Sequence, residues 1–126
     1  MKLILKDIAS SEQALTNLLE QKPPAIASYK IQRALRHIIP EIELFSKTRD
    51  ELVQKYGKPI EGQPGAFQIA PEFAKQYEEE MTTLINQELE LDLHPIPLSD
   101  LKTLDIQVRD MLLLDYLIVD DVKGDE

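Results

Sequence analysis

The chain has 126 residues, a length that suits one domain able to bury about two-thirds of its unfolded surface without covalent staples. It contains no cysteine, which excludes disulfides, thiolate nucleophiles and cysteine-ligated zinc and is typical of proteins in a reducing cytoplasm. Its formal net charge is −9, and its apolar runs are too short to span a membrane, so we expect a soluble, cytoplasmic protein.

The first quarter of the chain predicts a short strand followed by a helix. In residues 1–8, Leu3 and Leu5 alternate with Lys2, Ile4 and Lys6, which favours a short strand, and the apolar run is too short for the core of a secretory signal. Ser10 and Gln13 have the spacing of a capping box and predict a helix over about 11–21. The proline pair at 23–24 ends that helix.

Residues 25–56 carry the strongest pattern in the chain, an apolar heptad repeat that we call the seam. The pattern predicts one helix from Ala25 to Tyr56, ended by Gly57 in the role of a C′ glycine. Pro40 lies inside the pattern without shifting its phase, so we expect one helix that is kinked at Pro40. Seven of its eight positions are apolar, and the eight are Ile31, Leu35, Ile38, Ile42, Phe45, Arg49, Leu52 and Tyr56.

A second helix is predicted after a turn rich in glycine and proline. Residues 58–70 should turn with positive φ at Gly62 and Gly65, and 66–69 should form a short strand. Pro71 suits the first position of a helix that reaches about Gln87 and returns antiparallel along the first one. Its apolar face consists of Phe73, Tyr77, Met81, Leu84 and Ile85.

The period of the pattern changes at Glu88. Leucines at 89, 91 and 93 alternate with acidic residues and histidine, which predicts a half-buried strand with its acids in water. A turn over 99–104 follows, and then a short helix over 108–117 that buries Met111, Leu112, Leu114 and Leu117. Residues 120–126 predict a flexible acidic tail.

The predicted fold is therefore α+β and predominantly helical, with residues 1–119 as a single domain. Two long antiparallel helices, the first kinked at Pro40, carry a small sheet and short terminal helices.

Groups that carry chemistry are scarce. Neither His37 nor His94 has a second histidine three or four residues away, and the four glycines form no phosphate loop. The acidic residues of the tail, Asp120, Asp121, Asp125 and Glu126, lack the spacing of a calcium loop. We therefore expect no enzymatic activity, no catalytic residue, no cofactor and no bound metal.

Four basic residues of the predicted long helix are the candidate interaction residues: Lys30, Arg33, Arg36 and Arg49. The first three form a stripe that either contacts an acidic partner or phosphates, or faces the acidic run 78–80 of the returning helix. Arg49 interrupts the seam, where a charge tends to fix register through an ion pair within the chain or between subunits.

The charge is distributed unevenly along the chain. Residues 1–58 hold ten Lys/Arg and seven Asp/Glu, whereas residues 59–126 hold four and sixteen. The acidic second half opposes binding to phosphates, so we expect a protein partner and no direct nucleic-acid or membrane binding.

Several short stretches resemble a group of small phage and prophage proteins of unknown function. They are, in the same order, Tyr29–Arg33, Lys55–Gly57, a glutamate-rich helix and residues 88–101. Pro40 and the turn at 59–64 are atypical of that group. The resemblance implies a phage or prophage origin and action in the host cytoplasm, and it lends no functional residue.

The leading functional hypothesis is a non-enzymatic interaction or assembly accessory protein that binds a protein partner or self-associates as a homodimer. The seam is longer than one short returning helix can cover. The alternative is an acidic inhibitor of a host nucleic-acid-binding defence protein, whose acidic half imitates phosphates. Contiguous acid on one face favours the inhibitor, and interspersed charge favours assembly.

Overall fold

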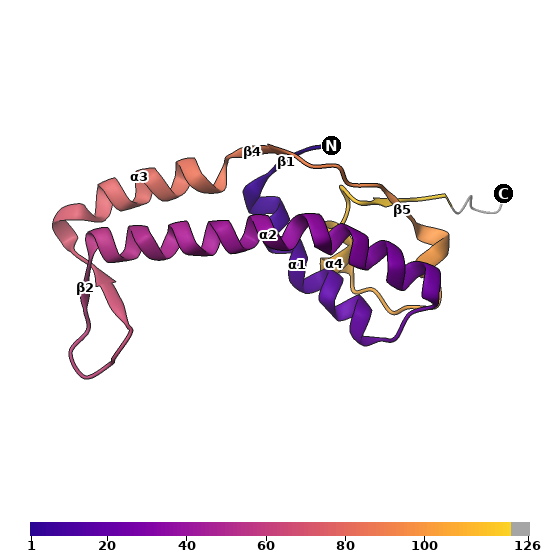
Figure 1. Cartoon of the computed structure of the whole chain (residues 1–126), viewed down its shortest axis with the longest axis horizontal. Coiled ribbons are helices and arrows are strands. Elements are labelled where there is room, and N and C mark those ends of the chain that lie inside the picture. The colour runs from indigo at the N-terminus through magenta and orange to yellow at the C-terminus, as the bar shows by residue number, and fades with distance from the viewer. Residues whose placement is uncertain (122–126) are drawn as a thin grey trace.

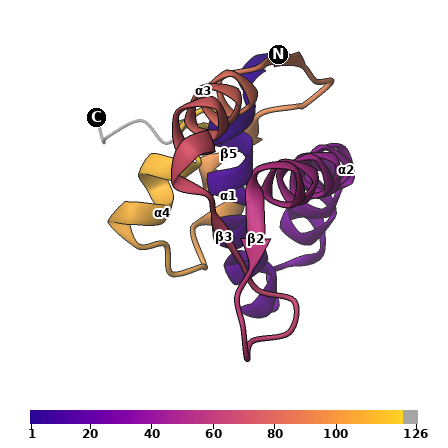
Figure 2. The same ribbon diagram turned by 90° about the vertical axis from the view of Figure 1, so that its left-hand side faces the viewer.

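The computed structural model describes residues 1–121, which form a mostly helical α+β fold, as predicted. Helix α2 (Ala25–Tyr56) runs the length of the molecule (Figure 1). Helices α1 (Leu5–Glu20) and α4 (Val108–Leu113) lie with its first half, and α3 (Ala74–Ile85) lies along its second half. The end-on view shows α3 beside α2 and a hairpin that projects away from both (Figure 2).

Six short strands form three two-stranded sheets. β1 (Lys2–Ile4) pairs antiparallel with β4 (Glu88–Glu90), and β5 (Ile96–Pro97) pairs parallel with β6 (Ile118–Val119). The projecting hairpin consists of β2 (Gly57–Pro59) and β3 (Phe67–Ile69). Single turns of 3-10 helix, η1 (Pro71–Phe73) and η2 (Leu98–Leu101), precede α3 and follow β5. The segment predicted as a strand after Glu88 thus pairs with the strand at the start of the chain.

The hydrophobic core lies in one half of the molecule, residues 1–40 and 88–121, which we call the body. Ile31 and Ile38 of α2 are fully buried there, and each such side chain contributes about 1.5–3 kcal/mol by leaving water. They belong to a cluster that also includes Ile8, Leu15 and Leu18 of α1, Leu91, Leu93 and Ile96 after β4, and Leu101, Leu114 and Leu117. The body therefore folds around the first half of the seam.

The other half of the molecule, residues 41–87, has almost no core, and we call it the arm. Within this range, all of which the structure describes, only Leu52 and Ala70 are buried. Helix α3 buries none of its residues, and the seam positions Ile42, Phe45 and Tyr56 are half-buried. The arm is therefore stabilised by partial contacts between α2, α3 and the hairpin.

The seam and the bounds of α2 agree with the prediction. Seven of the eight seam positions are buried or half-buried, and Arg49 is exposed. The helix is continuous across Pro40, and the kink stays a prediction. Helix α3 is shorter than predicted, because Pro71 begins a turn of 3-10 helix and the helix ends at Ile85.

Glycine has two different roles in the hairpin. Gly62 and Gly65 have φ of 81° each, as predicted for the turn. Gly57, in contrast, is extended, with φ −104° and ψ 165°, so the predicted left-handed C′ role is wrong. A Cβ at residue 57 would collide with the carbonyl oxygen of Val53, so the position requires glycine for lack of space.

Helix α1 begins at Leu5, six residues before the predicted start, and the capping box is wrong. Ser10 Oγ donates to the Lys6 carbonyl at 2.9 Å and Ser11 Oγ donates to the Ile8 carbonyl at 2.8 Å, as hydroxyls inside a helix do. Burial of Leu5 and Ile8 against the body outweighs the local signal of the serines.

The predicted helix over 108–117 ends at Leu113, and the predicted burial of Leu112 is wrong. Leu112 is 73% exposed, whereas Leu114 and Leu117 are fully buried. The chain turns at this point, because the N–H groups of Leu117 and Ile118 both donate to the Leu114 carbonyl. Leu117 therefore reaches the core through a turn instead of along a helix face.

The start of the predicted acidic tail is bonded to the body. Asp121 accepts hydrogen bonds from the Ser99 backbone N–H at 2.9 Å and from Ser99 Oγ at 2.5 Å, which lower the pKa of its carboxyl. Residues 122–126 of the tail lie outside the described residues, and the single domain over 1–119 stays a prediction.

We expect the pKa of Asp121 to rise when Ser99 is replaced by alanine, because the hydroxyl donor to the carboxylate is lost. A carboxyl with a lowered folded pKa stabilises the fold above its unfolded pKa, and this contribution disappears as pH falls through the folded value. NMR titration of the side-chain carboxyl carbon measures the change, with Ser10→Ala as the control. An unchanged Asp121 titration in Ser99→Ala contradicts the contact.

Leu35→Ala should destabilise the protein by about 2–5 kcal/mol, because Leu35 is 7% exposed within the core cluster. The matched control is Leu112→Ala, which removes the same atoms from a side chain that is 73% exposed and should cost less than about 0.5 kcal/mol. Urea unfolding at equal protein concentration measures both. Equal losses for the two variants contradict the assignment of the core.

Candidate interaction surface

The four candidate interaction residues do not form one surface, because Lys30 is engaged inside the protein. Its Nζ lies 2.5 Å from Oδ2 of Asp100 in η2, and the side chains are 24% and 22% exposed. The alternative in which Lys30 faces the acidic run of α3 is therefore wrong. Glu80 of that run contacts Lys55 and Tyr56 instead.

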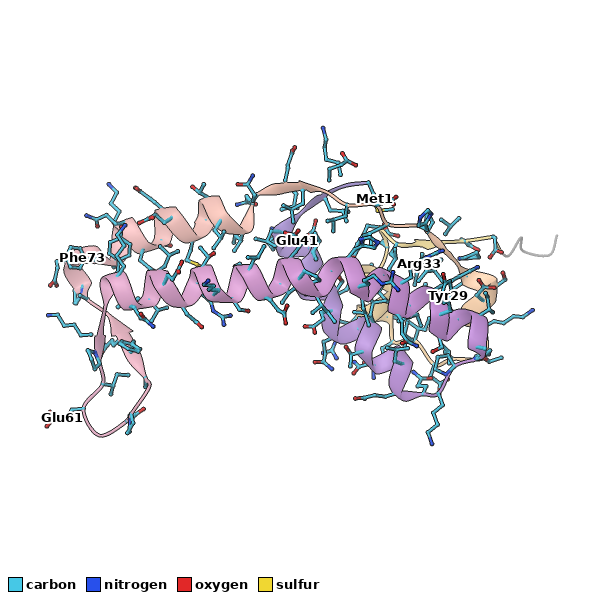
Figure 3. The ribbon with its side chains drawn as sticks, viewed as in Figure 1. Met1, Tyr29, Arg33, Glu41, Glu61 and Phe73 are labelled. Carbon is cyan, nitrogen blue, oxygen red and sulfur yellow. The ribbon has the colours of Figure 1, made fainter. Side chains whose placement is uncertain are left out.

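Tyr29 and Arg36, which are exposed, and Arg33, which is half-buried, line one side of α2, which we call the arginine surface. The guanidinium of Arg33 lies 5.5 Å from the centroid of the Tyr29 ring, and Tyr29 is 58% exposed. Figure 3 shows Tyr29 and Arg33 on the half of α2 that is away from α3. The three residues line a hollow of about 440 Å³ together with Ala25, Ser28 and Gln32.

Within residues 1–121 the two guanidinium groups of the arginine surface have no ion-pair partner, as is also true of most lysines in this range. Stacking on Tyr29 favours one placement of the Arg33 guanidinium. A planar guanidinium can donate two parallel hydrogen bonds to a carboxylate or a phosphate. The surface is therefore suited to an anionic ligand group.

Arg49 lies apart from the arginine surface, on the arm. Its Nε is 3.6 Å from Oδ1 of the neighbouring Asp50, and its guanidinium lies 5.7 Å from the Phe45 ring centroid. The side chain is 45% exposed. Its interaction role stays a prediction, and its internal partner is a sequence neighbour on the same helix.

At the end of the arm, a polar cluster and not a hydrophobic core holds the elements together. Tyr56 Oη donates to Glu80, and Lys55 Nζ lies 3.7 Å from the same carboxylate. The hydrogen bond with Tyr56 and the charge of Glu80 raise the pKa of Lys55. The Tyr56 ring also contacts Phe73, with centroids 5.6 Å apart. These contacts join the end of α2 to η1 and α3.

Sequence reasoning missed a groove between α2 and α3. Its volume is about 490 Å³, and it is lined by Thr48 and Leu52 of α2 and by Glu79, Glu80, Thr83 and Leu84 of α3. Leu44, one helical turn before Thr48, is 61% exposed. Leu44 lies off the heptad seam, so the pattern gave no signal for it.

The described part of the chain shows no arrangement typical of a metal centre. Within residues 1–121 no three histidine, aspartate or glutamate side chains are grouped as metal ligands. His94 is exposed, with Nε2 3.8 Å from Oδ1 of Asp92. Over the same residues, no helix is long and apolar enough to cross a membrane.

Comparisons with protein-family models, with curated proteins and with solved structures find no match.

Lys30 and Asp100 should show a coupling of about 1 kcal/mol in a double-mutant cycle, because the pair is partly shielded from water. The cycle compares the unfolding free energies of Lys30→Ala, Asp100→Ala and the double variant. A parallel cycle with Arg36→Ala in place of Lys30→Ala should give a coupling near zero. Equal coupling in both cycles contradicts the separation of Lys30 from the arginine surface.

Proposed function

We propose that the chain is a non-enzymatic protein-interaction protein, an accessory to assembly that is encoded by a phage or prophage and acts in the host cytoplasm. The observation that carries this proposal is the arm, which buries only Leu52 and Ala70 over residues 41–87. Helices depend mainly on packing of their apolar face for stability. An arm with so little packing of its own gains stability when a partner covers it.

The arginine surface supports a protein partner with exposed carboxylates. Arg33 and Arg36 lie one turn apart beside a hollow, and Tyr29 adds an exposed aromatic ring. Aromatic and arginine side chains are enriched where binding energy is concentrated in protein interfaces. A DNA-binding protein commonly contacts about six to ten phosphates. The two arginines supply positive charge for only a small part of that number.

The pattern of ion pairs supports assembly over the acidic-inhibitor alternative. Basic side chains stand beside acidic ones in the body, where Lys30 pairs with Asp100. The same holds in the arm, where Lys55 lies near Glu80 and Lys58 lies 3.7 Å from Glu72. An imitation of a nucleic acid needs a contiguous acidic face.

Pro40 has a place in this proposal, because it lies at the border between body and arm. Proline removes the hydrogen bond to the carbonyl four residues earlier and commonly kinks a helix. A kink at Pro40 sets the angle at which the arm leaves the body, and it completes the proposed pair of antiparallel helices formed by α2 and α3.

The test is capture of a protein partner from phage-infected host cells, followed by reconstitution of binding from purified components. Arg33→Glu/Arg36→Glu should weaken that binding about tenfold or more, because the arginine surface becomes acidic. The control is Lys6→Glu/Lys102→Glu, which changes the net charge equally at two exposed residues of the body outside the arginine surface. Binding that both double variants weaken equally reflects net charge alone and contradicts a role for the arginine surface.

The same proteins should not retard duplex DNA at low micromolar concentration in low salt, where electrostatic binding is strongest. Electrophoretic mobility shift across a salt titration measures this. Micromolar binding that falls steeply with salt and disappears in Arg33→Glu/Arg36→Glu overturns the protein-partner proposal.

A further inference from the structure

The arm exposes a large apolar side chain next to a groove with leucine in its wall. Leu44 is 61% exposed, and Thr48 and Leu52 follow it at intervals of one turn along the same side of α2. Thr48 and Leu52 line the groove, and Leu44 does not. Leu44 and the groove thus lie next to each other on one surface. Within the chain, the Leu44 side chain does not line the groove.

This surface is complementary to itself under a two-fold rotation. When two copies of a helix pack antiparallel, residues at equal distances before and after the axis face each other. With the axis at Thr48, Leu44 faces Leu52 of the second copy, four residues on either side. Each contact then occurs twice, as in an isologous interface. Threonine is small enough at the crossing point to let the helices approach closely.

The charges fit the same register. Glu41 and Lys55 lie seven residues before and after Thr48, so they face each other across the axis. Glu41 forms no ion pair with any residue from 1 to 121, and it lies at the start of the arm (Figure 3). Lys55 is 61% exposed and lies 3.7 Å from a single carboxylate, that of Glu80. A second carboxylate can reach its ammonium from solvent.

We propose that the arm is a homodimerisation element, in which α2 of one copy packs antiparallel on α2 of a second copy with the two-fold axis at Thr48. Leu44 of each copy enters the groove at Leu52 and Leu84 of the other, and Glu41 pairs with Lys55. This inference rests on the proposed function, because it names the partner that covers the arm. The contact is small, so the dimer forms with a dissociation constant of about 1–100 µM.

Sedimentation equilibrium over a concentration series tests the contact. Leu44→Asp should weaken the dimer about tenfold or more, because it places a charge in the groove. The matched control is Leu112→Asp, at a leucine of similar exposure on the body, and it should leave the dimer intact. Glu41→Lys and Lys55→Glu should each weaken the dimer, and the double variant Glu41→Lys/Lys55→Glu should restore it. Circular dichroism confirms that each variant folds.

The absence of cysteine from the chain allows a direct test of the axis. Thr48→Cys introduces one thiol per copy beside the axis. Under oxidised glutathione, which is reduced as the two thiols join, a disulfide-linked dimer should form. Gln13→Cys, at an exposed position of α1, should form it at least about tenfold more slowly.

A parent chain that stays monomeric to about 200 µM, or equal cross-linking of the two cysteine variants, overturns the dimer. A dimer that Leu44→Asp does not weaken also overturns it. Each of these results leaves the proposed function standing, because binding of another protein through the arginine surface is measured separately. If the arginine surface binds no protein partner while the dimer stays intact, the proposed function is contradicted and the dimer stands.

Discussion

The apolar seam of α2 continues beyond the body into the arm, where fewer side chains cover it. Most other features of the molecule depend on this difference in burial. The first three seam residues are buried in the body by α1 and by the segments that follow β4. The later ones have only α3 and the hairpin beside them, and these leave most of the arm half-exposed. A 32-residue helix thus joins a well-packed half to a poorly packed one. The difference in burial separates a part with a hydrophobic core from a part that leaves most of its apolar side chains half-exposed.

Periodic patterns in the sequence predicted the elements whose environment is repetitive. The heptad spacing predicted the correct bounds of α2, because every seam position from Ile31 to Tyr56 except Arg49 is buried or half-buried. Alternation after Glu88 predicted a strand over Leu89–Leu93 and the burial of Leu91 and Leu93. Both leucines are buried, but the strand itself ends at Glu90. Positive φ at Gly62 and Gly65 followed from turn chemistry, which is local.

The predictions that failed depended on tertiary contacts. Ser10 looked like a helix cap, but Leu5 and Ile8 gain more by extending the helix into the core. Leu112 looked buried because residues 111–114 are all apolar, and only the packing of the short helix on the body decides that Leu114 and not Leu112 faces the core. Lys30 was expected either to contact a partner or to face the acidic run 78–80, and its actual partner Asp100 is seventy residues away in the chain. The groove could not be predicted, because it forms where two separate helices meet.

The two candidate interaction surfaces, the arginine surface and the groove of the arm, differ in their charge. In the body, Lys30 is neutralised by Asp100, and only Arg33 and Arg36 of the basic stripe face outward without a carboxylate from residues 1–121. In the arm, Lys55 lies 3.7 Å from Glu80, so one of the two carboxylates that line the groove has a nearby positive charge. A groove with apolar side chains suits a second copy of the chain, since long-range repulsion between acidic copies is screened at physiological salt. The arginine surface suits an acidic group instead.

The proposed dimer leaves both arginine surfaces open. With the axis at Thr48, the last residue of α2 in the second copy, Tyr56, faces Pro40, so that helix stops before it reaches Arg36. Arg33 lies fifteen residues from the axis, which places the two copies of Arg33 about 45 Å apart along the helices at 1.5 Å per residue. The dimer therefore presents two identical anion-binding patches at opposite ends. A repeated acidic partner, such as a subunit of a growing assembly, can bind both ends at once, and linking two weak contacts raises the overall affinity without any new contact.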